Sequence, residues 1–208
     1  MPQRHLTHLL QRRPELAGVS PSIKQAYEVL RKCFQSGGKI LLCGNGGSAA
    51  DADHWAGELL KGFCHDRPLP KKARGSLRPA IATKLQGALP AIPLTSFPAA
   101  STAFGNDVDP VLAYAQLTSA LGRRGDVLVG ISTSGHAKNV CAAAEVARAK
   151  GMKVIALTGA SGGKLKGLSD VCIRAPSAET FRAQEYHLPI YHCLSLMLEE
   201  RFFGGGKG

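Results

Sequence analysis

The sequence lacks the features that would assign it to a membrane or to an oxidising compartment. No apolar stretch approaches ~20 residues, the length that a membrane-spanning helix requires, so we expect none. The N-terminal stretch MPQRHLTHLLQRRPE is too polar and too broken for a secretory signal. The six cysteines show no CxxC spacing and are most simply explained as reduced thiols. These absences predict a cytoplasmic protein without a membrane partner.

Acidic residues are scarce as well. Only 15 Asp and Glu stand against 26 Lys and Arg, which gives a formal net charge of +11. This excess favours anionic partners such as phosphorylated metabolites, nucleic acids or acidic membranes. No aromatic stacking platform or recognition motif accompanies the basic residues, which disfavours nucleic acid. The 208 residues, 44% of them hydrophobic, suffice for the core of one α/β domain and are too few for two comfortable ones.

Short apolar runs alternate with helical patterns along the chain. The runs are continuously apolar, which predicts strands covered on both faces. Their positions are 40–43, 91–94, 126–131, 153–157 and 171–173. Pro93 places the second run at a strand end or a sheet edge, and Gly151 is expected to cap a helix over 140–150. Further helices are predicted over 23–34 and 179–203. The pattern predicts a doubly wound, flavodoxin-like, five-stranded parallel sheet between layers of helices, an α/β three-layer sandwich.

One segment does not fit this pattern. Residues 67–90 contain four of the twelve prolines and few apolar residues in any period. Together with Lys61 the segment holds seven basic side chains: Lys61, Arg67, Lys71, Lys72, Arg74, Arg78 and Lys84. We interpret it as a basic insertion with a short helix near 81–85. The domain boundaries expected around it are an N-terminal helical region over 1–36 that packs in an oligomer, the main domain over 37–204, and a disordered tail over 205–208.

Two loops follow predicted strands and precede predicted helices, where open α/β sheets bind ligands. The first is Gly44-Asn45-Gly46-Gly47-Ser48, whose glycines let the backbone approach an anion at a helix N-terminus. The second is Ser132-Thr133-Ser134-Gly135, which has more hydroxyls than a helix cap requires. A tight turn and ordinary capping are the alternatives. Both loops should open onto one crevice, which favours a phosphorylated ligand.

Two helices carry candidate acid–base or metal residues. His54 and Glu58 are four residues apart and share a helix face, although such a pair is often only a solvated contact. The last helix carries Gln184 and His192. Eight helical residues rise ~12 Å, so one straight helix can hardly offer both to a single metal. If both are ligands, a symmetric assembly that shares the site is the easier geometry.

Five spaced motifs resemble the SIS-domain phosphoheptose isomerases. They are CGNGGSAADADHWAGELLKGF, GNDV, GDVLVGISTSG, GMKVIALTG followed by GGKL, and AQEYHLPIYH, in the family's order between Lys39 and Glu200. The resemblance implies a homotetramer with active sites shared between subunits. It also implies conversion of sedoheptulose 7-phosphate into a heptose 7-phosphate through an enediol or enediolate, an early step toward lipopolysaccharide or other surface glycans.

Site residues follow from the same resemblance. It implies one zinc ion per active site, with four ligands: His54, Glu58, Gln184 and His192. It implies that Glu58 and His192 form the acid–base pair, although zinc ligation and proton transfer by one residue are alternatives. The implied substrate contacts are Asn45, Gly46, Gly47, Ser48, Asn106, Asp107, Ser132, Thr133, Ser134 and Gln184.

The chain departs from the family pattern in three places. After STSG the family usually has Asn-Ser, whereas this chain has His136 and Ala137, so Lys138 or His136 would have to replace a missing hydroxyl. The insertion over 67–90 separates Glu58 from Asn106 by more residues than usual, either as an active-site rim or as a bland surface loop. Trp55 and Gly57 also differ, which concerns packing at most.

Two other functions compete with a phosphoheptose isomerase. A non-catalytic relative that binds the replication initiator lacks the acidic residue and the second histidine of the site, whereas Glu58 and His192 are present here. A SIS isomerase for another sugar phosphate, such as an arabinose or hexulose phosphate, generally has a different acid–base arrangement. The separation of Gln184 and His192 argues against it.

Overall fold

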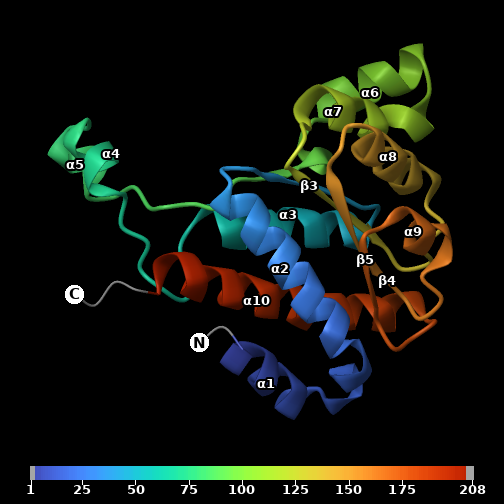
Figure 1. The fold of residues 1–208 in the computed structure, drawn as a ribbon. Helices are drawn as coiled ribbons and strands as arrows, with labels where there is room; N and C mark the ends of the chain where they lie inside the picture. Colours follow the sequence, from blue (N-terminus) through green and yellow to red (C-terminus); the bar gives the residue numbers. More distant parts are fainter. Residues whose placement is uncertain (1–2, 205–208) are drawn as a thin grey trace.

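A five-stranded, all-parallel sheet forms the centre of the molecule in the computed structural model, which describes residues 3–204. The strand order is β2-β1-β3-β4-β5 (Figure 1). The strands are β1 (Ile40–Cys43), β2 (Ala91–Pro93), β3 (Val127–Ser132), β4 (Lys153–Thr158) and β5 (Val171–Arg174). All five lie within a residue or so of the predicted runs. Pro93, expected at a strand end or a sheet edge, is the last residue of β2, and β2 is an edge strand. The predicted fold class is confirmed.

Helices cover both faces of the sheet and make three layers (Figure 1). One face packs against α1 (Gln3–Arg12), the 3-10 helix η1 (Pro14–Val19), α2 (Ser20–Gln35), α3 (Gly47–Leu60) and α10 (Thr180–Phe203). The other face packs against α7 (Ala113–Leu121), α8 (Lys138–Ala149) and α9 (Gly163–Leu168). Between β2 and α7 lie η2 (Leu94–Ser96), α6 (Pro98–Asp107) and η3 (Pro110–Leu112). Neither α6 nor α7 was predicted.

The strands are continuously apolar because each face of the sheet has its own core. Ile40 and Leu42 join the cluster beneath α2, α3 and α10, whereas Leu41 and Cys43 join the cluster beneath α7 and α8. All four side chains have 0% exposure. Alternate residues of a strand point to opposite faces, so only an unbroken apolar run fills both cores.

The N-terminal helices pack on the chain's own core. Leu6, Leu9 and Ile23 are buried in the same cluster as the sheet residues. The boundary expected at residue 37 therefore stays a prediction, and so does the packing of 1–36 in an oligomer. The tail predicted over 205–208 lies outside the described residues. Within residues 3–204, no helix combines the length and the apolarity that crossing a bilayer requires.

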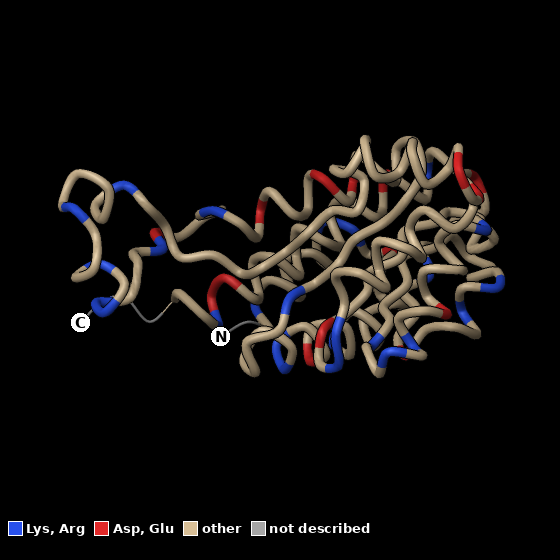
Figure 2. The backbone as a smooth tube through the Cα atoms, turned by 90° about the horizontal axis from the view of Figure 1, so that it is seen from above, with Lys and Arg blue, Asp and Glu red and all other residues tan. Residues whose placement is uncertain are grey.

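The insertion over 67–90 projects from the body as an arm (Figures 1 and 2). It carries two short helices, α4 (Lys71–Gly75) and α5 (Pro79–Ala82), and all residues from 71 to 80 are exposed. The second helix overlaps the short helix expected near 81–85 but begins and ends earlier. Arg67 at the root of the arm differs from the other basic residues of the insertion because its side chain is buried.

Candidate active site

A cavity of about 200 Å³ lies at the carboxyl ends of β1 and β3. This is the point where the strand order reverses, and ligands of doubly wound sheets bind there. The cavity is lined by Asn45, Ser48, Ile131, Ser132, Thr133, Ser134, Ala137, Thr180 and Gln184. We call it the strand-end cavity. Both predicted loops meet in it, together with the start of α10.

The structure shows why two positions of the first loop are occupied by glycine. Gly46 has φ +55°, a conformation that side chains other than glycine rarely adopt. Gly47 opens α3, and a Cβ at this position would lie 2.5 Å from the amide nitrogen of Gln184. Any larger residue at position 47 would displace Gln184, so this glycine brings the first loop and α10 into contact.

Side-chain amides and a hydroxyl organise the rest of the cavity wall. Asn45 and Asn139 exchange two amide hydrogen bonds of 2.9 and 2.8 Å, which join the first loop to α8. The Ser134 hydroxyl accepts a hydrogen bond from the backbone of His136 at 3.1 Å. Ala137 lines the cavity at the position of the missing hydroxyl, while His136 and Lys138 are exposed.

A second group of polar side chains lies between α3 and α10. One nitrogen each of His54 and His192 and one carboxylate oxygen of Glu58 lie within 4.8 Å of one another. We call these three residues the histidine–glutamate cluster. The His54 Nε2 to Glu58 Oε1 distance is 3.2 Å, and the two imidazole rings are 5.1 Å apart between centroids. The predicted pair on α3 is thus joined by His192 of the same chain.

Two polar atoms of the cluster lack a hydrogen-bond partner. Among the described residues, His192 Nε2 and Glu58 Oε2 are buried and have no hydrogen-bond partner. Burial is the first cause that lowers the pKa of His192, and the neighbouring His54 lowers it further. A neutral imidazole with a free lone pair beside a carboxylate is a metal ligand or a base.

The donor set fits zinc. Two imidazoles and one carboxylate, with atoms close enough to share an ion, are typical zinc ligands. His192 Nε2 and Glu58 Oε2 have no hydrogen bond among the described residues, and the exposed Lys61 ammonium lies 3.9 Å from Glu58 Oε2. An ion held between the two atoms would satisfy both. Gln184 lies instead against Gly47 in the strand-end cavity, so its role as a fourth ligand stays a prediction.

The strand-end cavity and the histidine–glutamate cluster lie at two places along the same helix pair, because α3 and α10 run side by side in the same direction; we call these places the cavity end and the cluster end. Gln184 meets Gly47 at the cavity end, and His192 meets His54 about two turns further on. Eight residues of α10 rise about 12 Å. This distance suits an elongated ligand whose anionic end occupies the cavity while its other end reaches the cluster.

Asn106 and Asp107 lie apart from both groups. They are exposed at the end of α6, where the Asn106 amide donates to the Asp107 carboxylate at 2.9 Å. Neither lines the strand-end cavity. Their predicted contact with substrate stays a prediction.

Sequence analysis missed a buried ion pair that joins α3 to α10 at the cluster end. Arg67 and Glu199 have 0% side-chain exposure, and Arg67 Nε lies 2.7 Å from Glu199 Oε1. The Arg67 guanidinium also donates to the backbone carbonyls of Glu58 and Leu59. Glu199 accepts three backbone N–H groups from residues 63–65. The first basic residue of the insertion is therefore an internal tie between α3 and α10 rather than part of the exposed arm.

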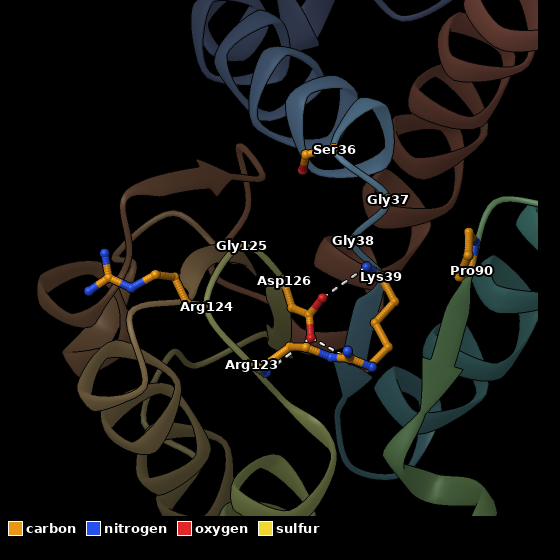
Figure 3. A pocket seen from close by; sticks show the side chains of 9 residues that line it. All are labelled: Ser36, Gly37, Gly38, Lys39, Pro90, Arg123, Arg124, Gly125 and Asp126. Atoms are coloured by element: carbon orange, nitrogen blue, oxygen red, sulfur yellow. Dashed lines mark hydrogen bonds and ion pairs between the residues drawn. The ribbon is translucent and has the colours of Figure 1, made fainter.

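A larger cavity, of about 400 Å³, lies at the amino-terminal ends of the strands (Figure 3). It lies before β1 and β3, and its buried Asp126 accepts hydrogen bonds from the backbone of Lys39 and of Arg123. The Lys39 ammonium pairs with the same carboxylate. Both carboxylate oxygens of Asp126 are thus used to join the segments that precede β1 and β3. Doubly wound sheets bind ligands at the carboxyl ends of their strands, which is not where this cavity lies.

The parallel strand order β2-β1-β3-β4-β5, with a polar cavity where the order reverses, is that of a doubly wound α/β protein that binds its ligand at the strand ends. The SIS domain family matches residues 15–159, more than half of the chain.

Individual relatives narrow the assignment. The phosphoheptose isomerase of Rhodospirillum rubrum is 41% identical over 186 residues, which cover 89% of this chain and 88% of the relative. That of Shewanella loihica is 40% identical over 201 residues, with 95% and 92% covered. The solved phosphoheptose isomerase of Neisseria gonorrhoeae superposes with a TM-score of 0.75 at 36% identity, over 95% of this chain and 96% of that one. The chain belongs to the phosphoheptose isomerase family of SIS-domain proteins.

Proposed function

We propose that the chain isomerises sedoheptulose 7-phosphate to a heptose 7-phosphate through an enediol or enediolate. The observation that carries this proposal is the convergence of Glu58, His54 and His192 between the same two helices, α3 and α10, that border the loop-lined cavity. Membership in the phosphoheptose isomerase family supports the reaction and its substrate.

The strand-end cavity would hold the phosphate. Backbone N–H groups at the start of α3 and the hydroxyls of Ser132, Thr133 and Ser134 are suitable donors for an anion. Asn45, Gly46, Gly47 and Ser48 would complete its contacts. A phosphate fixed there places the carbonyl end of an extended sugar toward the cluster, because α3 and α10 lead from one to the other.

The cluster would move the protons. Isomerisation removes a proton from the carbon next to a carbonyl and returns one to its neighbour. Glu58 is suited to take the carbon-bound proton, since its Oε2 is buried and has no hydrogen-bond partner within residues 3–204. His192, kept neutral by burial, is suited to exchange a proton with the sugar oxygens.

A zinc ion would be held by His54, Glu58 and His192, with Gln184 as the further predicted ligand. When bound it would polarise the substrate carbonyl as a Lewis acid. For Glu58 and for His192, zinc ligation and proton transfer are alternative roles.

The family resemblance also supports a cytoplasmic homotetramer with sites shared between subunits, which acts early in lipopolysaccharide or surface-glycan synthesis. Asn106 and Asp107, exposed at the end of α6, are then available to a site shared between copies. In the same way, the exposed residues 71–80 of the arm would be free to contact a neighbouring subunit or a second anionic group of the substrate.

The test is an NMR or coupled assay of the purified protein with sedoheptulose 7-phosphate, with and without a chelator. We expect appearance of the aldose 7-phosphate, and loss of turnover on chelation that added zinc restores. Turnover of arabinose 5-phosphate or fructose 6-phosphate instead would refute the heptose assignment. Absence of turnover with all three sugars would leave a non-catalytic SIS protein.

A further inference from the structure

Behind His54, on the side away from Glu58, lies a chain of hydrogen bonds that the proposed reaction does not use. Tyr191 precedes His192 on α10 and is fully buried, with 0% exposure. Its hydroxyl lies 3.0 Å from His54 Nδ1 and donates to Asp51 Oδ1 at 3.3 Å. The Tyr191 ring stacks on Trp55, with ring centroids 5.6 Å apart and planes inclined by 17°. Packing therefore fixes the position of the hydroxyl.

The donor and acceptor in each of these hydrogen bonds follow from the number of protons available. A tyrosine hydroxyl has one proton to donate. The hydroxyl donates to Asp51 Oδ1, and among the described residues Asp51 Oδ2 is buried and unpartnered. With its one proton directed at Asp51, the Tyr191 oxygen accepts at its second contact, which puts the hydrogen of His54 on Nδ1. The competing assignment has Tyr191 donate to Nδ1 and His54 Nε2 donate to Glu58 Oε1, and the spectra described below distinguish the two.

A neutral imidazole has one N–H. With the hydrogen on Nδ1, His54 Nε2 keeps its lone pair, and this atom faces Glu58 Oε1 at 3.2 Å. Two acceptors then face each other in the cluster, beside the unpartnered Nε2 of His192. A cation between them satisfies all three, and a histidine ligand normally donates its other N–H to such an outer partner.

We infer that Asp51 and Tyr191 form a relay that sets the tautomer of His54 and thereby prepares it as a zinc ligand. Tyr191 is a positioning residue that acts through His54. The inference rests on the proposed zinc site, but its first consequence, a hydrogen on Nδ1 of His54, can be measured without any ion.

The first experiment reads the tautomer directly. Imidazole ¹H–¹⁵N correlation spectra of the zinc-free protein at pH 8, with the His54 signals assigned by their loss in His54→Gln, should show the Nδ1–H form. Tyr191→Phe removes one oxygen and keeps the ring, and should shift His54 toward the Nε2–H form. An Nε2–H form in the wild type overturns the relay, whether or not zinc binds.

The second experiment measures zinc affinity by competition with a chromophoric chelator. Tyr191→Phe should bind zinc 10- to 100-fold more weakly, the usual effect of losing such an outer partner. The control is Tyr27→Phe, a buried tyrosine on α2, which should bind as the wild type does. Equal affinity in Tyr191→Phe and the wild type would contradict the inference.

Asp51→Asn completes the test as one arm of a double-mutant cycle. If Asp51 acts through Tyr191, adding Asp51→Asn to Tyr191→Phe should weaken zinc binding no further than the larger single effect. Additive losses would show that Asp51 acts on the ion by its charge alone, which refutes the relay. A wild type that isomerises sugar without binding zinc, yet shows the Nδ1–H form, would overturn the proposed metal and leave the relay standing.

Discussion

The strand-end cavity and the histidine–glutamate cluster are formed by different kinds of structure. The strand-end cavity consists of loops: glycines, hydroxyls and backbone N–H groups that follow β1 and β3 directly in the sequence. The histidine–glutamate cluster consists of side chains from the middle of two helices, more than 130 residues apart in the chain and fixed by packing. Loops at strand ends suit recognition of an anion, whereas rigid helices suit chemistry that depends on position.

The interactions that hold the cluster and the cavity in place also differ. Beneath the cluster, the buried pair of Arg67 and Glu199 ties the last carbonyls of α3 to α10. At the cavity, Ser134 and Asn45 are exposed, and their contacts are local turns and amide pairs. We therefore expect changes at the cluster end to affect turnover and stability, and changes at the cavity end to affect substrate affinity.

The largest effect should come from Glu58→Gln. This change removes the carboxylate base while the cavity stays intact, so turnover should fall by roughly 10²- to 10⁴-fold, the usual contribution of a positioned acid or base. Calorimetry should still detect binding of the sugar phosphate. Turnover within tenfold of the wild type would remove Glu58 from the reaction.

The next effect is on stability. Arg67→Met leaves the Glu199 charge buried without its partner, which should lower the free energy of unfolding by about 3–5 kcal/mol. Urea denaturation followed by circular dichroism measures this loss. The matched control is Lys72→Met on the exposed arm, expected to stay within about 0.5 kcal/mol of the wild type. Equal losses in both variants would mean that the pair does not hold the cluster end.

Sequence alone predicted the cavity better than the cluster, for a physical reason. The strands and both loops are local features, because an apolar run and the glycines or hydroxyls after it follow one another in the chain. The pairing of His54 with His192 depends on how α3 packs on α10, and only the family resemblance anticipated it. Arg67 was counted with the other basic residues of the insertion because nothing in the local sequence shows that Glu199 reaches it.

The missed relay shows the same limit. Asp51 lies one helical turn before His54, a spacing that was available in the sequence, but Tyr191 reaches His54 only through tertiary packing. Helices α6 and α7 were missed because the region after β2 offers no strong apolar period. Conversely, Pro93 predicted a strand end or a sheet edge, because proline cannot donate to a central ladder, and it lies at both.

The stability of the protein should depend on pH through His187, which lies on α10 between Gln184 and His192. His187 on α10 is fully buried, its Nε2 lies 3.2 Å from the Thr158 carbonyl, and burial lowers its pKa to about 4. The unfolded chain binds this proton more readily, so the contribution of His187 to stability is complete above about pH 6.5 and is lost as the pH falls toward 4. Between pH 7 and pH 5 this should cost about 2 kcal/mol.

Urea denaturation at the two pH values measures this loss. His187→Asn removes the titrating group, so its stability should differ less between pH 7 and pH 5 than that of the wild type, whatever its absolute stability. An unchanged difference would mean that other groups carry the acid sensitivity.

The smallest effect should come from the cavity. Ser134→Ala removes one hydroxyl from an exposed loop, so stability should change little. If this hydroxyl contacts the phosphate, losing a hydrogen bond to a charged group should raise KM about tenfold, or about 1.4 kcal/mol, with kcat nearly unchanged. Steady-state kinetics beside Ser119→Ala, at a hydroxyl on α7 outside the cavity, separates the two parameters. A fall in kcat at constant KM would contradict the division of labour between the two ends, because it would give the cavity a part in the chemistry.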